Sequence, residues 1–261
     1  MSNLFKRVIV GVIGIPLLIA VFYFGGIALL VFSLIVSSIA LWEFLTITEK
    51  KDLHPQKVTG VILSAAIILC SYFTDIEFLS MVYVSSSILI CAEILKKEKA
   101  DPLNPVTALF GLIYITIPFS ILSELNKYSE LNLVIYVFVL IWTCDTSAYF
   151  GGRFFGKHLL SPLSPKKTWE GSVSGFLFTV LVSLIIHFIY PDKLNFNDAL
   201  MTGMIIGIFS QAGDLFESLV KRFCGVKDSS GLIPGHGGIL DRFDSLIFAV
   251  PLIFIYFRYV K

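Results

Sequence analysis

Nine apolar stretches of roughly membrane-spanning length occupy most of this 261-residue chain, and they limit its fold more than any other feature. A helix needs about 20 mainly apolar residues to cross a bilayer. The composition agrees, since 56% of the residues are hydrophobic and 15% are charged, against about a quarter charged in soluble domains. The sequence therefore predicts an all-α integral membrane protein with about nine transmembrane helices. The predicted spans are residues 8–24, 27–47, 58–74, 78–95, 105–123, 132–150, 171–190, 199–216 and 244–259.

The loop charges predict how these spans are oriented. With a cytoplasmic N-terminus, 16 of the 20 Lys and Arg residues fall on the cytoplasmic side, as the positive-inside rule requires. The four on the other side are Lys127, Lys193, Arg258 and Lys261. We therefore expect a multi-pass protein of the cell membrane whose C-terminus lies outside and whose active site faces the cytoplasm.

The eighth predicted span carries a polar stripe. Ser210, Asp214, Glu217, Ser218 and Lys221 share one helix face, which leads into a long polar segment. An ordinary i, i+4 ion pair explains Glu217 and Lys221. It does not explain Asp214, one turn deeper among apolar neighbours, and we interpret this residue as a metal ligand.

The segment Ser218–Asp244 gathers four basic residues, three aspartates, His236 and five glycines in an otherwise apolar chain. Gly235, Gly237 and Gly238 permit positive φ and close approach of a phosphate, although such clusters are more often simple turns. Asp241 and Asp244 follow at i, i+3, where acidic residues also suit a helix N-terminus. A lone histidine among glycines is more often structural than catalytic.

A second polar loop precedes residue 171. Two prolines stiffen it, and Lys166, Lys167 and Thr168 offer donors to phosphate oxygens, beside Glu170. Such lysine pairs also serve simply as topology determinants. Asp145 from the preceding span lies toward the same side of the membrane.

Glu43 and Glu93 also lie near cytoplasmic helix ends, where we expect them to reach interfacial water or a lysine.

Carboxylates for Mg²⁺ together with cations for phosphates indicate phosphoryl or nucleotidyl transfer at the membrane surface. If the nucleophile is a lipid phosphate, no general base is needed, because its second pKa is about 6. Two alternatives remain. A CTP-dependent lipid kinase would use similar groups with a base near the acceptor, and a transporter would place carboxylates near the bilayer centre on broken helices.

The residues from Ser218 to Asp244, including Lys221-Arg222, Lys227-Asp228, Ile233-Pro234 and His236-Gly237-Gly238, resemble the signature of the phosphatidate cytidylyltransferases, also called CDP-diacylglycerol synthases. The loop Ser161–Gly171 and the Asp145 region are similar to that family too. The resemblance implies a helical multi-span enzyme that converts CTP and phosphatidate to CDP-diacylglycerol and pyrophosphate in phospholipid biosynthesis. It also implies Mg²⁺, with a second cation left open, and a homodimer; no nucleic-acid partner is expected.

The resemblance also implies roles for individual residues. The implied metal ligands are Asp145, Asp214, Asp241 and Asp244. The implied catalytic residues are Lys221, Arg222, Lys227, Asp228 and Arg242. The implied substrate-binding residues are Lys166, Lys167, Thr168, Glu170, Ser218, His236, Gly237 and Gly238. We expect an N-terminal region of about five spans over residues 1–130 and a catalytic region over 131–261, whose two cytoplasmic loops cover 151–170 and 217–243.

Overall fold

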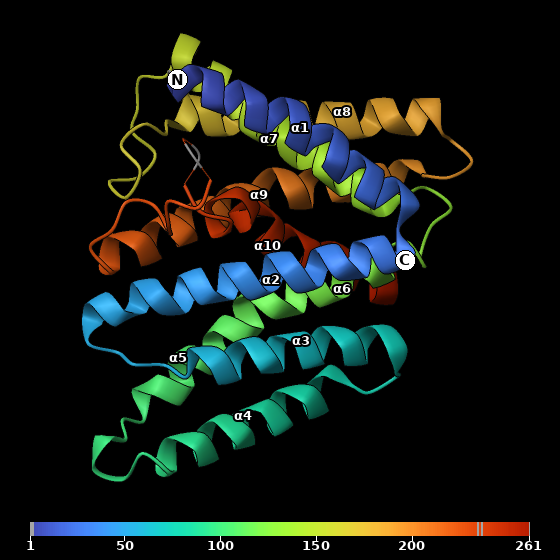
Figure 1. Cartoon of the computed structure of the whole chain (residues 1–261). Helices are drawn as coiled ribbons and strands as arrows, with labels where there is room; N and C mark the ends of the chain where they lie inside the picture. Colours follow the sequence, from blue (N-terminus) through green and yellow to red (C-terminus); the bar gives the residue numbers. More distant parts are fainter. Residues whose placement is uncertain (1–2, 234, 236, 261) are drawn as a thin grey trace. The chain divides into compact units, whose positions relative to one another are not determined.

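The computed structural model describes residues 3–233, 235 and 237–260, and its regular elements are helices (Figure 1). Across those residues the only extended pairings are two isolated bridges, Leu159 with Thr168 and Ile233 with Gly237. The predicted all-α class is confirmed for this part of the chain. The helices are α1 (Asn3–Phe24), α2 (Gly26–Thr48), α3 (Lys57–Phe73), α4 (Phe78–Ile94), α5 (Leu103–Gly111), α6 (Ile117–Leu125), α7 (Leu133–Phe155), α8 (Trp169–Ile189), α9 (Phe196–Phe223) and α10 (Leu240–Ile255).

Every predicted span coincides with helix. The π-helical segment η3 (Leu112–Thr116) joins α5 and α6 into one run, and η4 (Tyr256–Val260) extends α10. Short 3₁₀ turns, η1 (Glu49–Lys51) and η2 (Lys97–Lys99), follow α2 and α4. In the described part of the chain, six helices are long and apolar enough to cross a membrane, and three apolar helices are shorter. Helices α3 and α4 have 17 residues each, at the lower limit of about 17 for a span, so nine crossings remain a prediction.

The chain forms two compact units, each described here by itself. The first contains the described residues up to Ser123 together with Phe223–Arg242. The second contains Glu124–Arg222 and the residues from Phe243 onward. The functional division expected at residue 130 remains a prediction.

In the first unit, α2 packs along α3 (Figure 1). Hydroxyl groups lie between these helices and η3, because the Ser64 hydroxyl is 3.0 Å from that of Ser37 and accepts a 2.9 Å hydrogen bond from Thr116. Small residues also bring the backbones close, since a Cβ on Gly111 would stand 2.7 Å from Leu41 Cδ1. Buried hydroxyl contacts and small residues of this kind hold helices together in lipid, where the hydrophobic effect between them is absent.

In the second unit, α7 packs along α8, and a buried tyrosine links both to α9. The Tyr136 hydroxyl lies 2.6 Å from Ser183 Oγ and 2.5 Å from Thr202 Oγ1. Near the opposite end of α7, a Cβ on Gly171 would stand 2.6 Å from the Ala148 carbonyl oxygen. The two helices therefore approach closely at Gly171, in the first turn of α8 after the α7–α8 loop.

Candidate active site

The α7–α8 loop is a compact turn that covers residues 156–168, shorter than the predicted 151–170 because helix continues at both ends. The N–H of Leu160 donates to the Lys167 carbonyl at 2.9 Å, and the N–H of Trp169 donates to the His158 carbonyl at 2.9 Å. Thr168 caps α8, since its Oγ1 accepts from the Gly171 N–H at 3.2 Å. These bonds fix the backbone that carries Lys166 and Lys167.

Glu170 supports this loop from the first turn of α8. Its Oε1 lies 2.6 Å from His158 Nδ1, and its Oε2 accepts from the N–H groups of Lys157 and His158 at 3.1 and 3.2 Å. The structure thus gives Glu170 contacts within the loop, and its predicted contact with substrate remains a prediction.

A pocket of about 440 Å³ lies within the second unit, between α7, the α7–α8 loop, the start of α8 and α9. Five predicted site residues from these separate segments line it together: Asp145, Lys166, Lys167, Thr168 and Asp214. The pocket therefore combines carboxylates with ammonium groups, as a site for phosphates and a metal ion requires.

The carboxylates in the second unit are close enough to influence one another. Asp244 experiences electrostatic repulsion from Asp214, Glu217 and Asp145. Lys167 forms an ion pair with Asp214, and both side chains are partly exposed. The ion pair places the Lys167 ammonium group next to the predicted metal ligand Asp214.

The oxygen donors in this pocket are of the type that Mg²⁺ binds. Among the described residues, no group of three or more His, Cys, Asp or Glu side chains is arranged to hold a metal ion. Mg²⁺ in phosphate-transfer sites, however, is usually held by one or two carboxylates, with phosphate oxygens and waters completing its shell. The oxygen donors of Asp145 and Asp214 in one pocket fit that pattern.

Polar residues that were not predicted from the sequence also line this pocket, among them Tyr149, Arg153 and Gln211. Arg153 Nη1 donates to the Tyr149 hydroxyl at 3.2 Å, and the Gln211 amide donates to the carbonyl oxygens of Ser172 and Gly207. Helical spacing could have found them. Tyr149 and Arg153 follow Asp145 at i+4 and i+8, and Gln211 precedes Asp214 by three positions.

The polar stripe predicted on α9 is present, and the helix continues to Phe223 instead of ending near residue 216. Glu217 is 1% exposed and accepts a 2.7 Å bond from Lys221, so the ordinary i, i+4 pair exists. Ser210 and Ser218 are buried. Helix α9 continues past residue 216 because its polar residues share one face. The Glu217–Lys221 ion pair also replaces the hydration that Glu217 loses on burial. The catalytic assignment of Lys221 and the substrate contact of Ser218 remain predictions.

In the first unit, Asp241 organises the segment that resembles the family signature. One of its oxygens, Oδ2, accepts hydrogen bonds from the Ser229 N–H (2.9 Å), the Ser229 hydroxyl (2.8 Å) and the Gly238 N–H (2.7 Å). The Gly238 N–H is therefore engaged by a carboxylate, and its predicted role toward substrate remains a prediction. Asp241 itself remains a predicted metal ligand that also has a clear structural role.

The expected positive φ values occur at two of the three glycines, 80° at Gly235 and 81° at Gly237. A Cβ on Gly237 would also stand 2.6 Å from Asp241 Oδ2. His236 lies outside the described residues. The remaining predicted residues of this segment and its flanks are exposed: Arg222, Lys227, Asp228 and Arg242.

Cys224 lies in the same segment, directly after α9, and is buried. Burial raises the pKa of its thiol, although the nearby ammonium of Lys51 acts in the opposite direction. Among the described residues, Cys70, Cys91, Cys144 and Cys224 are free thiols.

Comparison with known proteins covers nearly the whole chain. The model of the cytidylyltransferase family matches residues 5–260. A phosphatidate cytidylyltransferase of Staphylococcus saprophyticus is 34% identical over 255 residues, which cover 95% of this chain and 96% of that protein. Proteins of the same name from Staphylococcus epidermidis and Staphylococcus aureus are 33% and 32% identical over 254 residues, with the same coverage of both chains. The chain therefore belongs to the cytidylyltransferase family.

Proposed function

We propose that this membrane enzyme is a phosphatidate cytidylyltransferase, which makes CDP-diacylglycerol and pyrophosphate from CTP and phosphatidate. The full-length similarity to proteins of that name carries the proposal. The pocket lined by Lys166, Lys167, Thr168, Asp145 and Asp214 supports it, because its groups match the charges of a triphosphate, a lipid phosphate and a divalent cation.

The reaction needs few proton transfers. A phosphatidate oxygen attacks the α-phosphorus of CTP, a new P–O bond forms, and the bond from the α-phosphorus to the bridging oxygen breaks with release of pyrophosphate. A phosphate monoester is largely deprotonated near neutral pH, since its second pKa is about 6, so the nucleophile needs no general base. The pocket accordingly contains cations and carboxylates without requiring a nucleophile–histidine pair.

The residues of the chain contribute binding and electrostatics. In this proposal Lys166 and Lys167 bind phosphate oxygens, and the Thr168 hydroxyl helps to hold the loop that presents them. Arg153 lines the same pocket and provides a further guanidinium for the lipid phosphate or the departing pyrophosphate. As the resemblance implies, Lys221, Arg222, Lys227 and Arg242 are also assigned to the phosphates, and Asp228 is assigned to catalysis.

Asp145 and Asp214, which line one pocket, would hold Mg²⁺. The resemblance also implies Asp241 and Asp244 as metal ligands. When bound, Mg²⁺ supplies Lewis-acid stabilisation of charge on phosphate oxygens. Asp145 and Asp214 would keep a positive charge inside the pocket, and Lys166 and Lys167 would orient the phosphates of the substrates.

The orientation in the membrane and the assembly are parts of the proposal. The loop charges favour an N-terminus and an active site on the cytoplasmic side, where CTP is available. A homodimer is proposed from the resemblance alone.

The reverse reaction tests this assignment. Purified protein given CDP-diacylglycerol, pyrophosphate and Mg²⁺ should form CTP and phosphatidate, and it should form neither when pyrophosphate is replaced by orthophosphate. A lipid kinase would fail to make CTP from these compounds, and that result would remove the proposed function.

A further inference from the structure

Glu43 on α2 is bonded to a segment almost two hundred residues away in the sequence. It is 4% exposed and accepts four hydrogen bonds, all within the first unit. Its Oε1 accepts from the Ser230 hydroxyl (2.5 Å) and the Ile239 N–H (3.1 Å), and its Oε2 accepts from the Ser229 hydroxyl (3.0 Å) and the Leu240 N–H (2.8 Å). The expectation that Glu43 simply reaches interfacial water or a lysine is wrong.

The chemistry of this contact is favourable for a buried charge. Ile239 immediately precedes α10 and Leu240 begins it, so both N–H groups belong to a helix N-terminus without partners inside the helix. A carboxylate there also interacts favourably with the helix dipole. Two hydroxyl donors add to this, and the four bonds together replace the water that Glu43 loses on burial.

The same segment holds Asp241, so the two carboxylates are linked. Ser229 Oγ lies within hydrogen-bonding distance of both Glu43 and Asp241, and its single proton serves one carboxylate at a time. Gly238 fits between them, because a Cβ there would stand 2.5 and 2.6 Å from the oxygens of Glu43. Loss of Glu43 would therefore loosen the backbone that also bonds Asp241.

We propose that Glu43 is a positioning residue for cytidylyl transfer. It holds the Ser229–Leu240 segment against α2 and thereby fixes the carboxylate of Asp241 at the start of α10. The link to catalysis rests on the proposed function, whereas the anchoring of the segment does not.

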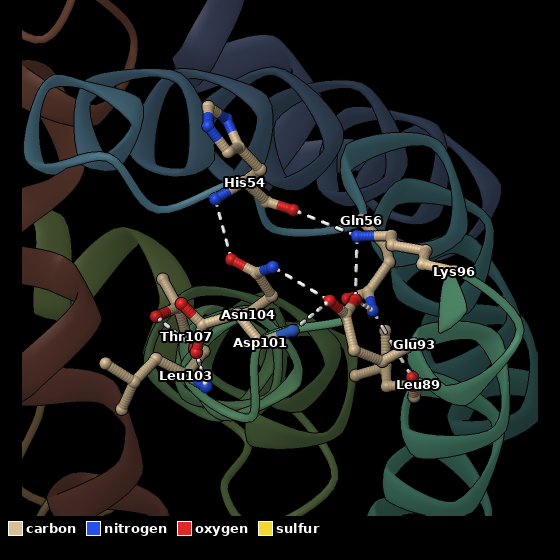
Figure 2. A network of polar contacts seen from close by, with 9 residues as sticks. All are labelled: His54, Gln56, Leu89, Glu93, Lys96, Asp101, Leu103, Asn104 and Thr107. Carbon is tan, nitrogen blue, oxygen red and sulfur yellow. Dashed lines mark hydrogen bonds and ion pairs between the residues drawn. The ribbon is translucent and has the colours of Figure 1, made fainter. Parts of the chain in front are cut away.

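Glu93 on α4 provides a matched control (Figure 2). It too is 4% exposed, and it accepts from the Asp101 N–H (3.0 Å), the Asn104 amide (2.8 Å), the Gln56 amide and the Lys96 ammonium (2.7 Å). Its partners lie in the α2–α3 loop, in the segment between α4 and α5 and at the start of α5, and none of these belongs to Ser218–Asp244. Glu93→Gln therefore perturbs an equally buried and equally bonded carboxylate away from the segment.

Hydrogen exchange of the full-length protein in lipid nanodiscs tests the anchoring directly. In Glu43→Gln, an amide group replaces one acceptor oxygen, and backbone exchange across residues 229–240 should rise by about tenfold or more, the scale of losing bonds to a charged acceptor. In Glu93→Gln, exchange should rise around residues 101–104 and stay unchanged at 229–240. Unchanged exchange at 229–240 in Glu43→Gln, or an equal rise in both variants, would overturn the proposal.

Activity measurements test the positioning role. Glu43→Gln should lower kcat and raise the Mg²⁺ concentration for half-maximal activity by about fivefold or more, the scale of one lost hydrogen bond. Glu93→Gln should leave the Mg²⁺ requirement unchanged. Faster exchange with wild-type kcat and wild-type Mg²⁺ requirement would contradict positioning. If the wild-type protein itself makes no CDP-diacylglycerol, the proposed function fails and the exchange result still decides the anchoring.

Ser230→Ala covers the case in which Glu43→Gln does not fold. It removes one of the four hydrogen bonds and leaves the buried carboxylate with three. Exchange at 229–240 and the Mg²⁺ requirement should then shift in the same direction by a smaller factor. An unchanged value for either quantity would contradict the proposal.

Discussion

The ammonium group of Lys167 forms an ion pair with the carboxylate of Asp214, which joins the α7–α8 loop to α9 inside the second unit. Residue type and local pattern predict different tasks for these two residues, phosphate binding for Lys167 and metal ligation for Asp214. The structure brings them to one pocket, where each neutralises the other. Both tasks can then be tested separately from stability, because a partly exposed ion pair contributes only about 0–1 kcal/mol to folding.

Replacement of Lys167 by Gln should reduce activity without unfolding the protein. We expect kcat/KM for CTP to fall by roughly a hundredfold, the scale of losing one electrostatic contact to the transition state. The melting temperature should change little. Lys157→Gln is the control, since Lys157 is exposed in the same loop and does not line the pocket. A large fall in melting temperature with unchanged kinetics would show that Lys167 is structural.

Replacement of Asp214 by Asn keeps the size of the side chain and removes its charge. Activity should fall by about a hundredfold or more and should not recover at high Mg²⁺, because a metal ligand is lost. Asp192→Asn, at an exposed position between α8 and α9, should behave as wild type. The activity of both variants is measured as a function of Mg²⁺ concentration. Normal activity of Asp214→Asn would exclude Asp214 from the site.

Gly238 should not tolerate a side chain. A Cβ there would press on the oxygens of Glu43 at 2.5 and 2.6 Å, so Gly238→Ala should lower stability by about 1–3 kcal/mol, as overpacking does, and abolish most activity. Gly231→Ala is the matched control in the same segment, because a Cβ at Gly231 would meet nothing within 4 Å. Thermal unfolding in detergent measures both variants, and equal effects would argue against the close contact.

The predicted membrane orientation can be tested with single cysteines in a background that lacks the four native ones. Cysteines at the exposed positions Lys166 and Lys227 should react with a membrane-impermeant thiol reagent only when the cytoplasmic face is open. A cysteine at the exposed position Lys193, on the opposite side in this topology, should react in intact cells. Labelling of position 227 from outside intact cells would contradict the proposed orientation.

The helices could be predicted from the sequence because their signal is local. Apolar length marked every span, and the errors lie at the ends, as in α9, which continues to Phe223 through the Glu217–Lys221 pair. Composition alone predicts that a helix ends where polar residues begin. It cannot show that two of those polar residues form an ion pair within a continuing helix.

The site could be predicted only in part. Asp145, Lys166, Lys167, Thr168 and Asp214 were chosen by residue type and local pattern, and the structure brings them to one pocket. The role of Glu43 could not be predicted, because an isolated carboxylate at a helix end has a simple local explanation. Its partners lie 186 to 197 positions away, and no local pattern reports such a contact.

The most direct test of the function follows the phosphorus of CTP. Purified protein is given phosphatidate, Mg²⁺ and CTP that carries a label at either the α- or the γ-phosphate, and the lipids are then extracted. Cytidylyl transfer places the α-label in the lipid and releases the γ-label as pyrophosphate. Appearance of the γ-label in the lipid, without the α-label, would contradict the account and establish a lipid kinase instead.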